Sequence, residues 1–130
     1  MENSFLKVKD YIVELGYTIS SEDESEGLLI INKEGEGISN MFIFCVDPIL
    51  VMEQFIFELK SEDASIYKEL LIKNQDIIHG AFTLDETGKK VIFRDTLQLE
   101  NLDLNEFEGS INSLTLLLSE YSSKIIEFAK

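Results

Sequence analysis

After residue 103 the hydrophobic pattern is the most regular in the chain. Apolar residues there are separated alternately by three and four positions, which places them on one face of an α-helix. The segment Asp103-Leu104-Asn105-Glu106 resembles a capping box with aspartate in place of serine or threonine. We predict one helix from Asp103 to Phe128, about 40 Å long, that packs across a sheet, with a coiled-coil-like contact to a second subunit as the alternative. Its apolar stripe is Leu104, Phe107, Ile111, Leu114, Leu118, Tyr121, Ile125 and Phe128.

Two earlier segments also have helical periodicity. The first runs from Ser4 to Leu15 and is followed by Gly16, a typical residue just past a helix end. The second runs from Ser65 to Ile78 and carries one polar residue, Asn74, on its apolar face. A buried asparagine is normally hydrogen-bonded, so Asn74 is expected to fix register or bond an exposed strand end rather than bind a ligand. The apolar faces are Phe5, Val8, Ile12 and Leu15 in the first helix, and Tyr67, Leu70, Leu71, Ile77 and Ile78 in the second.

Between the helices, segments rich in β-branched and aromatic residues alternate with turn sequences, a pattern typical of antiparallel strands. Asp47 and Pro48 suit positions i and i+1 of a type I turn. The whole pattern predicts an α+β fold with an antiparallel sheet flanked by three helices, in the order α-β-β-β-β-α-β-β-α, as a single domain over residues 1–130. The predicted strands are Tyr17–Ile19, Leu28–Asn32, Met41–Val46, Leu50–Leu59, Phe82–Leu84 and Val91–Leu99.

The strand from Leu50 to Leu59 predicts a binding surface. If Phe55, Phe57 and Leu59 point into the core, strict alternation turns the intervening side chains outward. Ile43 and Cys45 on the preceding strand would extend that outward face, and methionine suits an adaptable contact surface. We therefore expect a polypeptide to bind the sheet face that the helices leave open, through Ile43, Cys45, Leu50, Met52, Gln54 and Ile56.

Charge limits the classes of partner. The 130 residues carry a formal net charge of −14 with 45% hydrophobic residues, which is normal for a folded domain but strongly acidic. Such a field disfavours nucleic acid and anionic membrane surfaces and favours basic or amphipathic protein segments. The first residues lack a basic, apolar signal sequence and no apolar run is long enough to span a membrane. With a single cysteine as well, we expect a cytoplasmic protein.

The residues available for catalysis are few. There is one histidine, His79, and one cysteine, Cys45, and Cys45 lies in an apolar run where a thiol is inert. The acidic run Glu22–Gly27 lacks the spacing and closing glutamate of an EF-hand, so a solvated turn is favoured over a metal site. Asp95 falls on the apolar face of its strand and could approach a sheet edge or a helix end. The sequence therefore predicts no enzyme, no metal and no cofactor.

The layout resembles the type III secretion chaperones of the Tir-chaperone type and the related YbjN-like domains. The sharper part of the resemblance is the second helix, with Leu70, Leu71 and Asn74, and the following hairpin from Gly80 through Gly88 to Leu99. Leu102-Asp103 and the long last helix resemble the family's final segment. The resemblance implies a bacterial α+β domain, usually a homodimer, that binds a protein segment without ATP.

Three functions are compatible with this sequence. The leading one is a non-enzymatic protein-binding module that holds a polypeptide segment, as small secretion-type chaperones do. The alternatives are an acidic immunity or inhibitor protein directed at a basic target, and a small-molecule-binding or YbjN-like regulator. A homodimer is expected, since the apolar strands and the long last helix need more cover than one subunit supplies.

Overall fold

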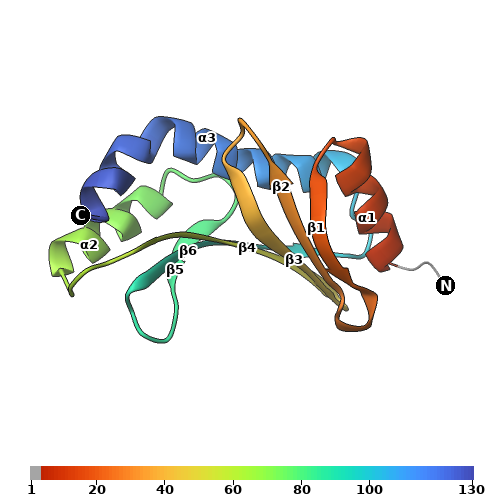
Figure 1. Ribbon diagram of the computed structural model, residues 1–130, viewed down its shortest axis with the longest axis horizontal. Coiled ribbons are helices and arrows are strands. Elements are labelled where there is room, and N and C mark those ends of the chain that lie inside the picture. The colour runs from red at the N-terminus through yellow and green to blue at the C-terminus, as the bar shows by residue number, and fades with distance from the viewer. Residues whose placement is uncertain (1–3) are drawn as a thin grey trace.

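A computed structural model describes residues 4–130 of the chain and confirms the predicted order of elements. Figure 1 shows a curved sheet with α1 beside its N-terminal strands, α2 at its other end, and α3 running along the top from near α1 to near α2. A single 3₁₀ turn, η1, interrupts the first hairpin. The elements are α1 (Ser4–Glu14), β1 (Thr18–Asp23), η1 (Glu24–Glu26), β2 (Leu28–Lys33), β3 (Ile38–Val46), β4 (Ile49–Glu58), α2 (Ala64–Asn74), β5 (Ala81–Leu84), β6 (Lys90–Gln98) and α3 (Leu104–Phe128).

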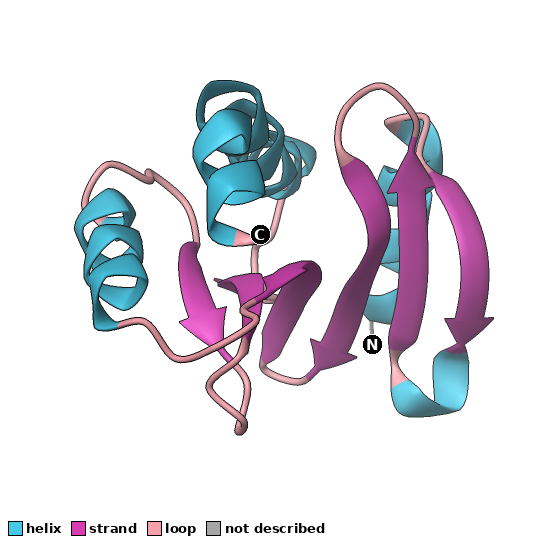
Figure 2. Ribbon diagram, turned by 60° about the vertical axis from the view of Figure 1, so that its left-hand side comes forward, coloured by secondary structure: helices cyan, strands magenta, loops and turns pink. Residues whose placement is uncertain are grey.

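The six strands form one antiparallel sheet in the order β1-β2-β3-β4-β6-β5. Consecutive strands are neighbours except where β6 inserts between β4 and β5, because α2 carries the chain out to the far edge (Figure 2). Buried side chains from α1, α2 and α3 join those of the sheet in one core cluster. The helices therefore cover one face of the sheet and leave the opposite face without a helical layer.

The long helix α3 crosses this core as predicted. Asp103 is its N-cap, and the carboxylate accepts a hydrogen bond from the backbone N–H of Glu106 at 2.7 Å. Most of the apolar stripe is buried, and Leu118 and Tyr121 pack against the core while partly exposed. The stripe of α3 is thus largely used within the subunit, as expected for a helix lying on a sheet.

Asp95 ties α3 to β6. Its carboxylate accepts a hydrogen bond of 2.6 Å from the hydroxyl of Ser110, a fully buried residue of α3, and one of 2.8 Å from the backbone N–H of Thr96. This contact explains a carboxylate on the apolar face of a strand. The side chain bridges the sheet and the helix that covers it.

A bulge in β4 reverses the predicted faces of that strand. The pairing register of β4 with β6 shifts between Phe55 and Phe57, so one extra residue breaks the alternation. Leu50 and Met52 point into the core before the bulge, Phe57 does so after it, and Phe55 is 55% exposed. The prediction that Phe55 shares a buried face with Phe57 and Leu59 is therefore wrong.

Two further predictions differ from the structure. Helix α2 ends at Asn74 rather than Ile78, because the next residues form i→i+3 turns that redirect the chain towards β5. Leu71 within α2 and Ile78 beyond its end, both expected on a buried face, are 70% and 83% exposed. Asp47 and Pro48 are the two central residues of the β3–β4 turn and are joined by a cis peptide bond, which belongs to a type VI rather than a type I turn.

Candidate functional site

The side chains predicted to bind a partner lie on the helix-covered face of the sheet. The exposed fraction is zero for Ile43, Leu50 and Met52, and Cys45 and Ile56 are partly buried against the same core. The expectation that these side chains point away from the core is wrong, because the β4 bulge separates Phe55 from the buried set. On the described surface of the subunit Ile43, Leu50 and Met52 are therefore not accessible to a partner, and Cys45 and Ile56 are only partly accessible.

Gln54, the polar member of that set, has a structural role. Its side-chain amide donates a hydrogen bond to the carbonyl oxygen of Gly37 at 2.9 Å and accepts one from the backbone N–H of Ser39 at 3.1 Å. The residue is 5% exposed, so both backbone groups would be poorly solvated without it. Gln54 therefore fastens the start of β3 to β4.

The opposite face of the sheet carries the accessible apolar surface. Strand pairing places Leu28 opposite Phe44 and Phe44 opposite Val51, with Ile30 opposite Phe42 and Val46 opposite Ile49 in the flanking rows. Directly paired side chains project from the same face, so these residues form one continuous group. Phe42 is 38% and Val46 is 54% exposed, whereas Val51 is only 8% exposed. We call the group the open-face patch: Leu28, Ile30, Phe42, Phe44, Val46, Ile49 and Val51.

Acidic side chains border the open-face patch. Asp23 of β1 is paired with Leu28, Asp47 lies in the turn beside Val46, and Glu53 is paired with Phe42. Glu53 forms a 2.6 Å ion pair with Arg94 of β6, so these two charges offset each other and the charges of Asp23 and Asp47 remain. The border is therefore net negative, and a partner with basic groups around an apolar segment would complement it.

A second apolar surface lies on α2. Leu70 is the only buried residue of this helix, whereas Leu71 is 70% and Ile72 57% exposed. Leu71 also approaches Leu84 of β5, which is 44% exposed, across a small hollow. We call Tyr67, Leu71, Ile72 and Leu84 the α2 surface, and it lies at the end of the molecule opposite α1 (Figure 1).

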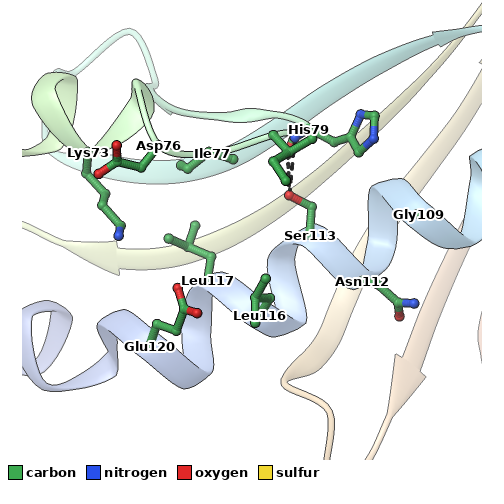
Figure 3. A pocket seen from close by; sticks show the side chains of 11 residues that line it. Lys73, Asp76, Ile77, His79, Gly109, Asn112, Ser113, Leu116, Leu117 and Glu120 are labelled. Carbon is green, nitrogen blue, oxygen red and sulfur yellow. Dashed lines mark hydrogen bonds between the residues drawn. The ribbon is translucent and has the colours of Figure 1, made fainter.

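A groove of about 280 Å³ separates α3 from the loop that follows α2 (Figure 3). Ile77 and Ile78 of the loop face Leu116 and Leu117 of α3 across it, and Asp76 and Glu120 supply carboxylates from the two walls. The hydroxyl of Ser113 donates to the carbonyl oxygen of His79 at 2.8 Å and accepts from the backbone N–H of His79 at 3.4 Å. These two hydrogen bonds hold the loop against the helix.

The two residues considered for catalysis are in separate places. His79 lies at the groove, whereas Cys45 lines a hollow beside Phe5 and Gly27 at the other end of the sheet. Burial, with a smaller contribution from the charge of Asp47, raises the pKa of the Cys45 thiol to about 11. A thiol with that pKa is a poor nucleophile at neutral pH.

Within residues 4–130, no three His, Cys, Asp or Glu side chains are grouped so that they could hold a metal ion.

Across the same residues, no helix combines the length and the hydrophobicity that a bilayer crossing requires. Of the chemistry-bearing residues, the structure thus brings together carboxylates around apolar surface rather than acid–base pairs. Such surfaces suit non-covalent binding.

The sequence matches the CesT_Tir_1 family over residues 1–130. The chain belongs to this family. Among curated proteins, none matches the sequence. The fold is shared with YbjN, a putative transcription regulator from E. coli, at a TM-score of 0.71 and 13% identity, with 92% of each chain covered.

Chains of the same fold also occur in complexes, among them these two. The first is the ExsC–ExsE complex, with a TM-score of 0.67, 18% identity, and 92% of this chain and 94% of that chain covered. The second is the HopA1–SchA chaperone–effector complex, with a TM-score of 0.65, 12% identity and coverages of 90% and 92%. The resemblance to secretion chaperones and YbjN-like domains, and the α+β fold class, are confirmed.

Proposed function

We propose that this protein is a non-enzymatic protein-binding module that holds an apolar polypeptide segment on the open-face patch. One observation carries the proposal. The seven apolar side chains of the patch are neighbours in the strand register, and within residues 4–130 no helix covers them. Exposed apolar surface of this kind is typical of interaction sites. Membership of the CesT_Tir_1 family and the chaperone–effector complex among chains of the same fold support the same function.

The charge around the open-face patch indicates the composition of the polypeptide segment that binds there. Asp23 and Asp47 border the patch, Glu53 and Arg94 neutralise each other there, and the whole chain carries a net charge of −14. The bound segment is therefore apolar in its centre and basic at its flanks. Burial of its apolar atoms stabilises the complex by ~25 cal/mol per Å², less the cost of ordering the segment.

Synthetic peptides with one shared apolar core test this proposal. Fluorescein-labelled 15-residue peptides would carry either lysine or glutamate flanks, and binding would be followed by fluorescence anisotropy. We expect the lysine-flanked peptide to bind and the glutamate-flanked peptide to bind at least tenfold more weakly. Equal binding of both peptides would contradict the assigned role of the border.

Two valines provide a matched pair of variants. Val46 in the open-face patch and Val13 on α1 are 54% and 61% exposed, so a glutamate costs little stability at either position. Val46→Glu should abolish binding of the lysine-flanked peptide, and Val13→Glu should leave it unchanged. If both variants bind as the wild type does, the open-face patch is not the site.

An acidic inhibitor of a basic protein is the second candidate, and the net charge of −14 favours it. The two functions differ in the response of binding to salt. Contacts between apolar groups persist at 1 M NaCl, whereas an interface held by exposed charges weakens because the Debye length falls to about 3 Å. Retention of peptide binding at that salt concentration would support the chaperone-like function over the inhibitor.

The proposal also includes the nature of the assembly and its surroundings. The α2 surface supports a homodimer, since two copies could bury Leu71 and Ile72 against each other. The net charge supports a protein that has neither nucleic acid nor membrane as a partner, and one cysteine suits the cytoplasm. Light scattering at micromolar concentration should give twice the chain mass of 14.9 kDa. A mass of one chain across a dilution series would refute the dimer.

A further inference from the structure

We propose that the groove between α3 and the loop after α2 accommodates an arginine or lysine side chain of a protein partner, at a site separate from the open-face patch. The groove is built by Asp76, Ile77, Ile78 and His79 on the loop side, and by Gly109 and residues 112–120 on the helix side (Figure 3).

The walls of the groove suit the aliphatic part of a basic side chain. Leu117 is 4% exposed and forms part of the floor, whereas Ile78 and Leu116 are 83% and 54% exposed. The volume of about 280 Å³ is below the ~300–1,000 Å³ of typical small-molecule sites. A single long side chain fits within this space.

The carboxylates of the groove suit the charged end of that side chain. Asp76 belongs to the loop and Glu120 to α3, and neither makes an ion pair within residues 4–130. Lys73, the one cation in the lining, lies over the ring of Tyr121, with 5.0 Å between its Nζ and the ring centroid. Arginine and lysine bury their methylene groups on apolar surface and keep the charge at its edge, which is the arrangement that the groove offers.

Gly109 keeps one end of the groove open. It lies inside α3, where glycine is less favourable than alanine by ~1 kcal/mol. A Cβ atom at this position would have no neighbouring heavy atom within 4 Å. A side chain here would therefore occupy the groove without disturbing the helix, so Gly109→Leu serves as a blocking variant that retains the fold.

Small arginine derivatives test the groove directly. The probe is N-acetyl-arginine N-methylamide, which reproduces an arginine residue within a chain, and its control is the corresponding citrulline compound, a neutral isostere. Chemical shifts of the backbone amides of Gly109, Asn112 and Ser113 would be followed by ¹⁵N NMR during titration of the full chain. We expect saturable shifts with the arginine compound and about fivefold weaker binding of the citrulline compound. Free arginine, with its charged backbone groups, should bind more weakly than the capped residue.

Variants complete the test. Gly109→Leu should abolish the shifts, and Asp76→Asn combined with Glu120→Gln should reduce the affinity to that of the citrulline compound. Val46→Glu should leave the titration unchanged, so failure here is distinguishable from failure of the peptide-binding function. Equal shifts with arginine and citrulline, or an unaltered titration of Gly109→Leu, would overturn the proposal.

Discussion

The side-chain amide of Asn74 pairs with both backbone groups of Phe82. Its nitrogen donates to the carbonyl oxygen of Phe82 at 3.2 Å, and its oxygen accepts from the backbone N–H at 2.7 Å. Phe82 is in β5, one of the two edge strands of the sheet, and Asn74 is the last residue of α2. The amide thus takes the place of a neighbouring strand at that edge and prevents pairing with another chain there. Asn74 was expected to fix register or to bond an exposed strand end, and the structure shows it bonded to the edge of β5 at Phe82, within the strand.

Replacing Asn74 should therefore destabilise the protein. Asn74→Ala leaves a half-buried N–H and C=O of β5 without their partner, and a loss of about 1–3 kcal/mol in the free energy of unfolding is expected. Urea unfolding followed by circular dichroism measures it. Asn112→Ala, at an exposed position on α3, is the control and should stay within about 0.5 kcal/mol of the wild type.

Periodicity predicted the fold well because most elements follow it without interruption. The stripe from Leu104 to Phe128 and the cap at Asp103 gave the position of α3 to within a residue. The faces of β4 could not be predicted in this way. A bulge inserts one residue between Phe55 and Phe57, and no glycine or proline marks the insertion. The alternation counted back from Phe55 towards Leu50 consequently placed each of these side chains on the wrong face of the sheet.

The binding surface that we propose still lies on the open sheet face, although its residues differ from those predicted. Phe42, Phe44 and Val46 were visible in the sequence as members of an entirely apolar strand. What the sequence lacked was the register that pairs Phe44 with Leu28 and Val51. The groove at Gly109 was not predicted at all, because it depends on how the loop after α2 meets α3.

Gly27 should be far less tolerant of alanine than Gly35. Both glycines have positive φ angles, 69° and 87°, so both variants place a side chain in the left-handed region. A Cβ atom at Gly27 would collide with the backbone carbonyl of Cys45, whereas none would lie within 4 Å at Gly35. We expect Gly27→Ala to lower the free energy of unfolding by at least about 2 kcal/mol more than Gly35→Ala. Similar urea midpoints for the two variants would show that η1 can move away from β3.

Charges on the α2 surface should produce a monomer. Leu71→Glu and Ile72→Glu place like charges opposite each other in the proposed dimer, while each residue is already more than half exposed in the subunit. Size-exclusion chromatography with light scattering should show loss of the dimer and an unchanged circular dichroism spectrum. Val13→Glu on α1 is the control, and it should remain dimeric. A dimer that tolerates both α2 variants would place the interface elsewhere.

The Cys45 thiol should react slowly and only at high pH. Burial raises its pKa from 9.0 to about 11, so at pH 8 the thiolate fraction is roughly a hundredfold smaller than for an unperturbed thiol. The rate of alkylation by iodoacetamide, measured by mass spectrometry, should be lower by at least that factor than for Ser123→Cys in a Cys45→Ser background, because Ser123 is exposed on α3. A rate close to that of the exposed thiol would mean that Cys45 is reached by solvent more readily than the structure shows.

The same pKa shift predicts that the free energy of unfolding falls in alkaline solution. The unfolded chain releases the thiol proton near pH 9 and the folded chain only near pH 11, so the folded state loses stability as the pH rises through this interval. Tyr17 acts in the same sense, since burial, with smaller contributions from Glu36 and Glu108, raises its pKa from 10.0 to about 12. We expect the urea midpoint to fall steadily between pH 9 and 11. Cys45→Ala should flatten the decline of the urea midpoint between pH 9 and 10, where Tyr17 contributes little. An unchanged slope in this interval would assign the loss of stability to other groups.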